Sequence, residues 1–440
     1  MTTQAEPIEA PLASEPRGEP VRTSLLSTLG VDVRLVGMVV ALAVLWIAFN
    51  FLSDGRFLTP RNLWNLSVQS SAVAVMTTGM VLIIVSRNID LSIGSILGFT
   101  AMIVGLLQAE WIPDILGLPL NAPGTWIVVV VLGICVGALI GGLHGFVIAF
   151  IGVPSFVVTL GGLLIWRGAA FALASGRTIA PLDPTYQLLG GGPQGALGAT
   201  LSWVVAGIAI VAFAIGLVLN RRRRRRYGFP VRPVWADVTI GIIGSLLVAV
   251  AVWIANAYPW PPNLAEEYAI ENGIPIPPGG LIIPTGIAYP VLIAIGIAVL
   301  MTFIAKRRRF GRYVYSIGGN PEAAVLAGIN TRRTIMKTFI LMGALSSIAA
   351  VIITARLNAS TLALGTGAEL QVIAAAVIGG TSLAGGIGTI AGGVLGAVIM
   401  QSLSTGMTLI GVDNAQQDMV AGVVLIVAVG FDSWLRRRRV

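Results

Sequence analysis

The sequence predicts an all-α polytopic integral membrane protein with about twelve transmembrane helices. Of its 440 residues, 56% are hydrophobic and 11% are charged, whereas soluble domains carry about 25% charged residues. Apolar segments recur along the chain, and most are close to the roughly 20 residues that span a bilayer as a helix. The composition therefore excludes a soluble enzyme, a disordered chain and a disulfide scaffold.

The first 30 residues differ from everything that follows. Residues 1–30 are rich in Glu, Pro, Ala and Ser, a composition typical of disordered segments. Their acidic start lacks the basic patch and apolar run of a signal peptide. We expect a disordered cytoplasmic tail that precedes the first span.

Twelve apolar segments follow the tail. They are 34–52, 68–86, 91–108, 126–150, 155–175, 200–219, 237–257, 287–305, 334–355, 369–379, 386–411 and 417–435. The segment 369–379 is too short to span a bilayer alone. Because GGTSLAGG follows it, the sequence predicts a broken helix or half-helix at this position.

The distribution of basic residues predicts the orientation of the chain. If both ends are cytoplasmic, 22 of the 28 Lys and Arg residues lie on the inside and 4 on the outside. Such an asymmetry is the positive-inside signal. The arginines flank spans and do not form one face with interleaved aromatic residues, which argues against nucleic acid as a partner.

The chain divides into two halves around a predicted insertion. We assign 31–220 to the first half of a transmembrane domain and 287–440 to the second half, with a cytoplasmic loop over 306–333. The intervening 221–286 begins with six arginines, includes one extra span and continues into a Pro-rich external loop. Prolines at this density favour an extended loop.

A first polar segment interrupts the apolar pattern at 81–102. It places Asn88, Asp90, Ser92 and the following Gly94 between two apolar runs, with no loop long enough to carry them away. Polar groups at membrane depth are costly and usually face a cavity or each other. We expect them to line a translocation pathway. The alternative is that Asp90 pairs with Arg87 or caps a helix.

A second, glycine-rich segment lies at 374–398. Glycines allow close helix packing and let the backbone leave the helix, and unwound backbone is tolerated only where it is buried or lines a cavity. An offset of 292 residues aligns Asp90–Gly94 with Ser382–Gly386, although only Leu and Gly are identical. Packing through small residues is again the alternative to a pathway. The candidate pathway residues in this segment are Gly379, Gly380, Thr381, Ser382 and Gly386.

The loop 306–337 contains signals for a short helix. Asn320 can cap it, a proline suits its first position and Glu322 suits its first turn. Ala323 and Ala324 continue the helix, and Gly328 can end it. Together with Gly319, these residues form a candidate docking helix for a cytoplasmic partner. A solvated loop helix is the alternative.

The sequence contains no sign of catalysis or of a bound cofactor. It has no GxxxxGK[ST], HExxH or GxSxG pattern. Its single cysteine, Cys135, excludes an intrachain disulfide, and one histidine, His144, cannot form a His-based metal site. We predict no catalytic residues, no metal site and a non-enzymatic role.

Three motifs together resemble a known family. NIDLSIGS (88–95), SIGGNPEAAVLAGIN (316–330) and VIGGTSLAGGIGTIAGG (377–393) resemble, in order and spacing, the inner-membrane permeases of carbohydrate ABC importers of the ribose/xylose/galactose type. GVPSFVVTLGGLLIWRG (152–168), the Arg-rich insertion and STGMTLIGVD (404–413) look most like the D-xylose branch. The resemblance implies a ten-helix core plus an inserted pair.

The resemblance also implies partners and a mechanism. It implies a homodimer in the inner membrane, a cytoplasmic ATPase that uses ATP and Mg, and an external sugar-binding protein. The chain itself would bind no cofactor. The helix Asn320–Gly328 would be the coupling helix, and the two polar segments would line the translocation pathway. The protein would transport a sugar, D-xylose or a related one, by alternating access. Ser86-Arg87-Asn88 departs from the family pattern, which leaves open whether Arg87 reaches the pathway or the cytoplasmic rim.

Two other functions stay open at this point. One is an ABC permease for another small solute, such as a branched-chain amino acid or a nucleoside. The other is an ion-coupled secondary transporter, in which Asp90 or Glu369 would be the membrane carboxylate.

Overall fold

The computed structural model describes the backbone of residues 33–437, so the predicted tail over 1–30 lies outside the described residues. Every regular element in this range is helical. Ten helices are long and apolar enough to cross a membrane, and two shorter apolar helices accompany them. The prediction of an all-α polytopic protein is therefore confirmed.

Long and half-length helices of the described range build the bundle. They are α2 (Val33–Leu52), α3 (Pro60–Val85), α4 (Ile93–Leu106), α6 (Thr125–Phe146), α7 (Ser155–Ala174), α9 (Gly198–Arg226), α10 (Val234–Asn256), α12 (Tyr289–Arg307), α15 (Thr331–Leu357), α16 (Ala368–Ile378), α17 (Ile390–Leu409) and α18 (Asn414–Arg437). The short connecting helices are α5 (Ile112–Leu116), α8 (Pro184–Gln187), α11 (Pro262–Glu271), α13 (Arg309–Gly319) and α14 (Pro321–Leu326).

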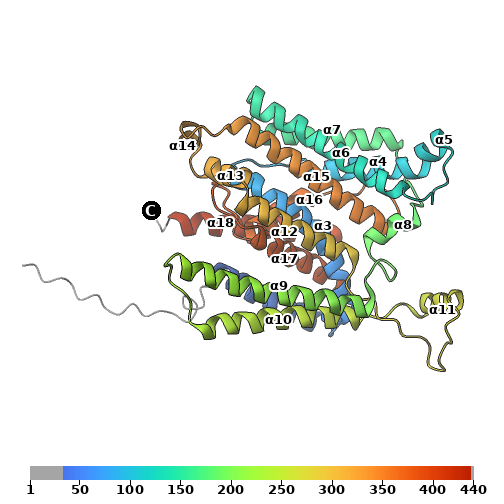
Figure 1. Cartoon of the computed structure of the whole chain (residues 1–440). Coiled ribbons are helices and arrows are strands. Elements are labelled where there is room, and N and C mark those ends of the chain that lie inside the picture. Colours follow the sequence, from blue (N-terminus) through green and yellow to red (C-terminus); the bar gives the residue numbers. More distant parts are fainter. Residues whose placement is uncertain (1–32, 438–440) are drawn as a thin grey trace, which may run out of the picture.

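The bundle has two distinct ends (Figure 1). The end with α13, α14, the end of α18 and the arginine-rich end of α9 is the basic face. The opposite face carries α5, α8 and α11. The long helices run between these two faces, as expected of transmembrane segments.

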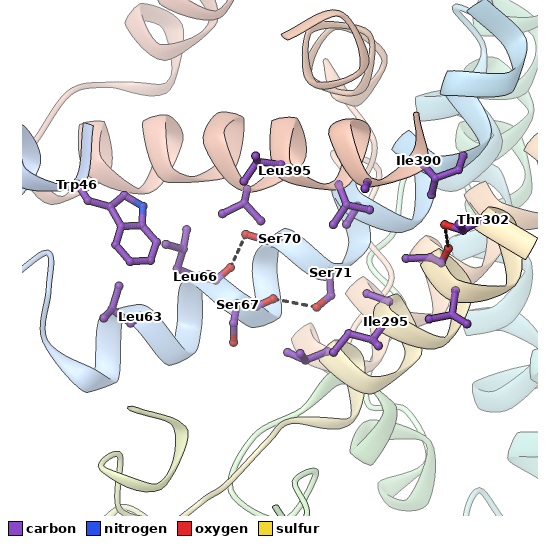
Figure 2. Close-up of a pocket in the computed structure, with 18 residues that line it drawn as sticks. Trp46, Leu63, Leu66, Ser67, Ser70, Ser71, Ile295, Thr302, Ile390 and Leu395 are labelled. Atoms are coloured by element: carbon purple, nitrogen blue, oxygen red, sulfur yellow. Dashed lines mark hydrogen bonds between the residues drawn. The ribbon is translucent and has the colours of Figure 1, made fainter. Parts of the chain in front are cut away.

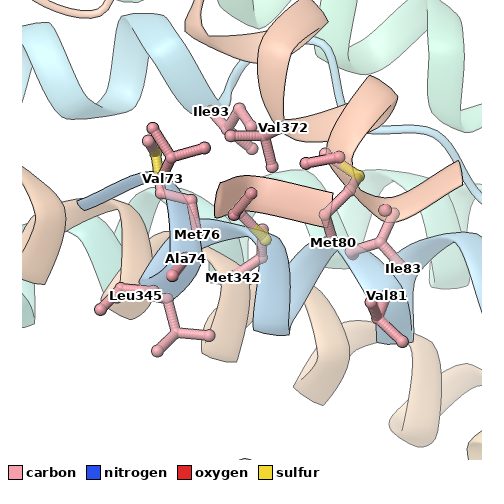
Figure 3. Close-up of a cluster of buried hydrophobic side chains, with 14 of the residues drawn as sticks. Val73, Ala74, Met76, Met80, Val81, Ile83, Ile93, Met342, Leu345 and Val372 are labelled. Atoms are coloured by element: carbon pink, nitrogen blue, oxygen red, sulfur yellow. The ribbon is translucent and has the colours of Figure 1, made fainter. Parts of the chain in front are cut away.

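Helix α3 forms the centre of the core. Thr59 caps its start, where Pro60 occupies a position that needs no backbone N–H. Nearly all of its side chains beyond Leu66 are buried, because α12, α15, α16 and α17 pack around it. Figure 3 shows Met76 and Met80 of α3 among the side chains of neighbouring helices. The second half of α3, residues 72–85, is almost entirely apolar, which suits a helix enclosed on all sides.

The packing of the two halves follows an inverted pattern. Helix α3 packs on α17 while α15 packs on α6, and α4 packs on α7 while α16 packs on α18. Helices α3 and α15 also contact each other and run in opposite directions between the faces. Inverted repeats of this kind are common in transporters.

A ridge of glycines joins α6 to its neighbours. Gly137, Gly141 and Gly145, spaced four residues apart, lie directly against the backbone of α15, and Gly133 faces α4. A Cβ atom at Gly141 would collide with the carbonyl of Phe339. This small-xxx-small spacing brings two membrane helices into backbone contact.

Helices α9 and α10 form a hairpin at the edge of the bundle (Figure 1). Arg221 and Asp237 form an ion pair between the two helices near the basic face. The hairpin touches the core mainly through α10 and α3, where Trp64 stacks at a tilt on Tyr258. The packing thus pairs α10 with α9, which runs across residue 221 and ends at Arg226, while the division of the chain at 220/221 stays a prediction.

Candidate functional site

Helix α4 begins inside the bundle because an extended segment precedes it. Residues 86–92 leave α3 at the basic face and run along α7, where the Ser155 hydroxyl accepts a hydrogen bond from the Ile89 amide at 3.3 Å. Ser92 lies beside Gly162. Gly162 is seven residues into α7, or about 10 Å at 1.5 Å per residue. The chain therefore re-enters the bundle before α4 starts.

Helix α16 follows a re-entrant segment, residues 358–367, which enters from the opposite face and consists largely of turns. Ser360 exchanges two backbone hydrogen bonds with Ile179, each 2.9 Å, and its hydroxyl donates to the Ala101 carbonyl at 2.7 Å. The segment continues along α4 until Gly365 packs against Gly94. The N-terminal ends of α4 and of the short helix α16 thus meet inside the bundle, and helix N-termini at membrane depth are found at transporter pathways.

Two of the predicted pathway residues belong to a buried polar chain. Asp90 Oδ1 accepts hydrogen bonds from the Ser92 amide at 2.9 Å and the Ser92 hydroxyl at 2.6 Å. Ser92 Oγ lies 3.2 Å from His144 Nδ1, and the Trp166 indole donates to His144 Nε2 at 3.0 Å. The chain links the start of α4 to α6 and α7.

The hydrogen bonds in this chain have one direction. An indole N–H can only donate, so Nε2 of His144 carries no hydrogen and Nδ1 carries one. Nδ1 then donates to Ser92 Oγ, whose own hydrogen goes to Asp90. Each member is satisfied by the next, which is what a buried polar network requires.

The other predicted residues near α4 have distinct contacts. Asn88 is buried and its amide donates to the Ser86 carbonyl and hydroxyl, at 3.0 and 3.1 Å. Gly94 leaves no room for a side chain, because a Cβ atom there would meet Gly365 and the Glu369 carboxylate. Oε2 of Glu369 is buried and has no hydrogen-bond partner among the described residues.

The second glycine-rich segment forms a tight loop at the basic face. Gly379 packs on Gly392 of α17, and Gly380 and Gly386 have positive φ angles of 83° and 76°. The Ser382 amide donates to the Ile387 carbonyl at 2.9 Å. Thr381 and Ser382 are buried beneath the loop. Glycine is needed at positions 380 and 386 because the left-handed backbone conformation disfavours other residues.

Arg87 holds this loop, α3 and α13 together. Its Nε donates to the Gly318 carbonyl at 2.7 Å and its Nη2 donates to the Gly319 carbonyl at 2.9 Å. The Gly386 amide donates to the Val85 carbonyl at 2.9 Å. Arg87 therefore lies at the basic rim, which answers the question that the sequence left open.

The predicted pathway residues thus fall in two places. Asp90, Ser92 and Gly94 lie where α4 begins, before a helix, whereas Ser382 and Gly386 lie after α16 at the basic face. The two segments are not equivalent in the inverted arrangement, so the 292-residue alignment does not reflect the repeat. Their role in a pathway stays a prediction.

The predicted docking helix is present as α14. Asn320 Oδ1 accepts a hydrogen bond from the Ala323 amide at 3.0 Å, and Gly328 ends the helix with a φ of 78°. Ala324 packs inward, but Leu326 is 89% exposed and Val325 is 56% exposed. An apolar knob on a short helix at a charged face is unusual for a surface that meets only water.

Helix α13 is fixed to the glycine-rich loop by a second contact. The Tyr315 hydroxyl donates to the Gly388 carbonyl at 2.8 Å, and burial raises the pKa of Tyr315. The hydroxyl therefore stays protonated and available as a donor. A displacement of α13–α14 would reach the loop through both Tyr315 and Arg87.

The chain matches known transport proteins along most of its length. Residues 185–429 match the family described as branched-chain amino acid transport system / permease component. The xylose transport system permease protein of Haemophilus influenzae is 34% identical over 92% of this chain and 97% of that protein. Its counterpart in Escherichia coli K12 is 35% identical, covering 91% and 92%. The chain belongs to this permease family.

Further relatives and the long helices agree with that assignment. The ribose import permease protein of Escherichia coli K12 is 31% identical to this chain, and the match covers 90% of this chain and 92% of that protein. No solved structure matches this chain. With ten long apolar helices among its described residues, the permease is a multi-pass membrane protein, and its relatives are transport subunits.

Two cavities lie away from the predicted pathway residues. The larger, about 660 Å³, lies between α2, α3, α12 and α17 (Figure 2). Its walls are almost entirely apolar, and the hydroxyls of Ser70 and Ser71 donate to their own helix. A smaller cavity of about 340 Å³ lies between α16, α17 and α18 and has polar walls.

Several residues at these sites escaped the sequence reasoning. His144 had no assigned role, and nothing near Trp166 in the sequence indicates that it would meet His144. The four-residue spacing from Gly133 to Gly145 is a signal that could have revealed the contact of α6 with α15. The fork from Arg87 to α13 joins residues more than 200 positions apart, and no local pattern encodes it.

Proposed function

We propose that this chain is the transmembrane permease subunit of an ATP-driven importer for D-xylose or a related monosaccharide. The observation that carries the proposal is the match over more than 90% of the chain to permeases named for xylose transport. The ribose match at lower identity supports a sugar over an amino acid or a nucleoside. ATP and Mg would be bound by a separate ATPase.

We assign the basic face to the cytoplasm and the chain to the inner membrane. The arginine-rich end of α9 and the basic loop before α13 support this orientation, because cytoplasmic loops carry an excess of Lys and Arg. Both termini would then be cytoplasmic. A second copy of the permease would complete the transporter, and an external sugar-binding protein would deliver the sugar.

The coupling helix in this proposal is α14. Leu326 and Val325 form an exposed apolar knob that suits a groove on the ATPase. Movement of α14 would pass through Gly318 and Gly319 of α13 to Arg87 and the extended segment 86–92. That segment precedes α4, so the ATPase would shift the start of α4 inside the membrane. Alternating access requires such a connection and no chemistry on the sugar.

The decisive experiment is reconstitution. The permease is placed in liposomes with the ATPase and sugar-binding protein of its host, and entry of labelled D-xylose is followed with and without ATP. Leu326→Glu and Glu322→Arg should abolish ATP-driven uptake and co-purification of the ATPase. Leu116→Glu, the same change at an exposed leucine on the opposite face, is the matched control. Full uptake by Leu326→Glu at normal expression would refute the coupling role.

Ion-coupled transport is the second candidate, because Glu369 Oε2 is buried without a hydrogen-bond partner among the described residues. This alternative predicts that uptake collapses with a protonophore at constant ATP and that Glu369→Gln is inactive. Uptake that follows ATP and ignores the protonophore would exclude it.

A further inference from the structure

The smaller cavity is built differently from the rest of the bundle. It is about 340 Å³ and lies between the re-entrant segment before α16, the outer half of α17 and the first turns of α18. Its size lies within the range of small-molecule sites. Its polar lining residues are Thr366, Gln371, Ser404, Asn414, Gln417 and Asp418.

Three of these side chains are free to bind a ligand. Ser404 donates to Gln417, and the Gln417 amide donates to Thr408 and to the Val412 carbonyl, so these groups hold one another. By contrast, the side chains of Gln371, Asn414 and Asp418 make no hydrogen bond or ion pair with another described residue. Two amides and one carboxylate therefore offer both donors and acceptors to the cavity.

The cavity leads from the opposite face toward the middle of the bundle. Asn414 lies where α18 begins, at that face. Met400 lines the deep end, nine residues before the end of α17, or about 14 Å along the helix. Thr366 connects the wall to the re-entrant segment and accepts a hydrogen bond from Arg167 of α7 at 3.0 Å.

The chemistry of the walls fits a small neutral polyol. Amides and carboxylates can each bind two neighbouring hydroxyls, while Met400, Leu403 and Met407 provide an apolar side for C–H groups. Asp418 is the one ionisable residue in the lining, and it would repel sugar phosphates. The larger cavity offers no comparable set, because each of its hydroxyls donates to a carbonyl of its own helix, α3 or α12.

We infer that this polar cavity is the permease's own binding site for a neutral monosaccharide, with Gln371, Asn414 and Asp418 as the residues that contact it. The inference rests on the proposed function and deepens it, since it places part of the sugar recognition in the membrane subunit. It also places the bound sugar next to the re-entrant segment 358–367. A bound sugar would therefore act on the contact between the starts of α16 and α4.

Site-directed labelling tests the cavity without requiring transport. Cys135, the sole cysteine, is replaced in Cys135→Ser, and Ser404→Cys then introduces a near-isosteric thiol in the cavity wall. The purified full-length permease is treated with a hydrophilic methanethiosulfonate, and modification is followed by mass spectrometry. D-xylose should slow the reaction by a factor of 1 + [xylose]/Kd, about threefold at twice the Kd. Thr178→Cys, on an exposed loop of the opposite face, should label at the same rate with or without sugar.

Two further measurements identify the ligand class and the residues. L-leucine should give no protection, and protection by leucine in place of xylose would overturn the sugar assignment. Adding Gln371→Leu to the labelling background should remove the protection by xylose. In liposomes the same substitution should lower xylose uptake about tenfold, as expected for the loss of about 1.4 kcal/mol of binding.

The inference and the proposed function can fail separately. If the wild type imports xylose with ATP but xylose does not protect the thiol of Ser404→Cys and Gln371→Leu imports normally, the cavity assignment is wrong and the importer stands. If the wild type does not import xylose with its partners, the proposed function is wrong. In that case, protection of the Ser404→Cys thiol by xylose would still support a sugar site in the cavity, and a lack of protection would overturn the cavity site as well.

Discussion

Arg87 is the residue with the clearest structural role at the basic face. Its side chain donates two hydrogen bonds to consecutive carbonyls at the end of α13. A guanidinium presents two donors in a fixed geometry, whereas a lysine ammonium is a flexible point charge. The contact therefore depends on the shape of the side chain as well as on its charge.

Substitution of Arg87 should uncouple ATP hydrolysis from sugar transport without unfolding the protein. Arg87→Ala removes two charge-assisted hydrogen bonds, each of which typically contributes about 1.5–3 kcal/mol. We expect ATP hydrolysis to continue with less sugar moved per ATP, and Arg87→Lys to be intermediate. The measurement is the ratio of sugar imported to phosphate released in liposomes, with Arg56→Ala on an exposed turn as the control. An unchanged ratio in Arg87→Ala would show that the contact is not part of the coupling.

Trp166 completes the polar chain through His144. Trp166→Phe keeps the aromatic ring but leaves Nε2 of His144 without its 3.0 Å donor. A buried acceptor that loses its partner costs about 1–3 kcal/mol, so the purified variant should melt at a lower temperature. Trp253→Phe, at a tryptophan that is 62% exposed on the hairpin, should melt like the wild type. Equal melting of all three proteins would mean that the indole bond does not stabilise the fold.

Among the helices, the contact of α6 with α15 is the most sensitive to side-chain volume. Gly141→Ala would drive a methyl group into the Phe339 carbonyl, whereas at Gly142 the nearest atom to a new methyl group is Ile340 Cγ1, at 3.4 Å. Overpacking typically costs about 1–3 kcal/mol. We therefore expect Gly141→Ala to lower the melting temperature clearly and Gly142→Ala to change it little. Equal effects of the two substitutions would contradict the backbone contact.

The elements were predictable to different degrees. Apolar length alone located the twelve bundle helices of the described range, and the Asn320, Pro321 and Gly328 signals located α14, because local chemistry governs span length and helix ends. The depth at which α4 starts inside the bundle was not predictable, since it depends on Gly94 packing against Gly365 more than 250 residues away. The polar cavity likewise unites residues from α16, α17 and α18 that follow no common spacing.

At the scale of the whole molecule, the hairpin α9–α10 is separable from the core. The chain leaves and re-enters the core at one point, where the Leu197 amide donates to the Ile287 carbonyl at 3.0 Å. Deletion of 198–286 with a short Gly/Ser linker should therefore leave a folded core. The deletion removes Tyr258, whose ring packs on Trp64. We therefore expect a moderate decrease in melting temperature, with ATP-driven uptake retained. Loss of folding would show that the hairpin is an integral part of the domain.

The length of α9 has a practical consequence. Its 29 residues extend for about 44 Å, longer than the roughly 30 Å hydrocarbon core, so its last turns and the start of α10 reach beyond the hydrocarbon core as a pair of helices. A soluble helical protein fused in register to both helices would be held rigidly. Such a fusion would give this 45.8 kDa chain the added mass and the recognisable shape that particle alignment in electron cryomicroscopy requires.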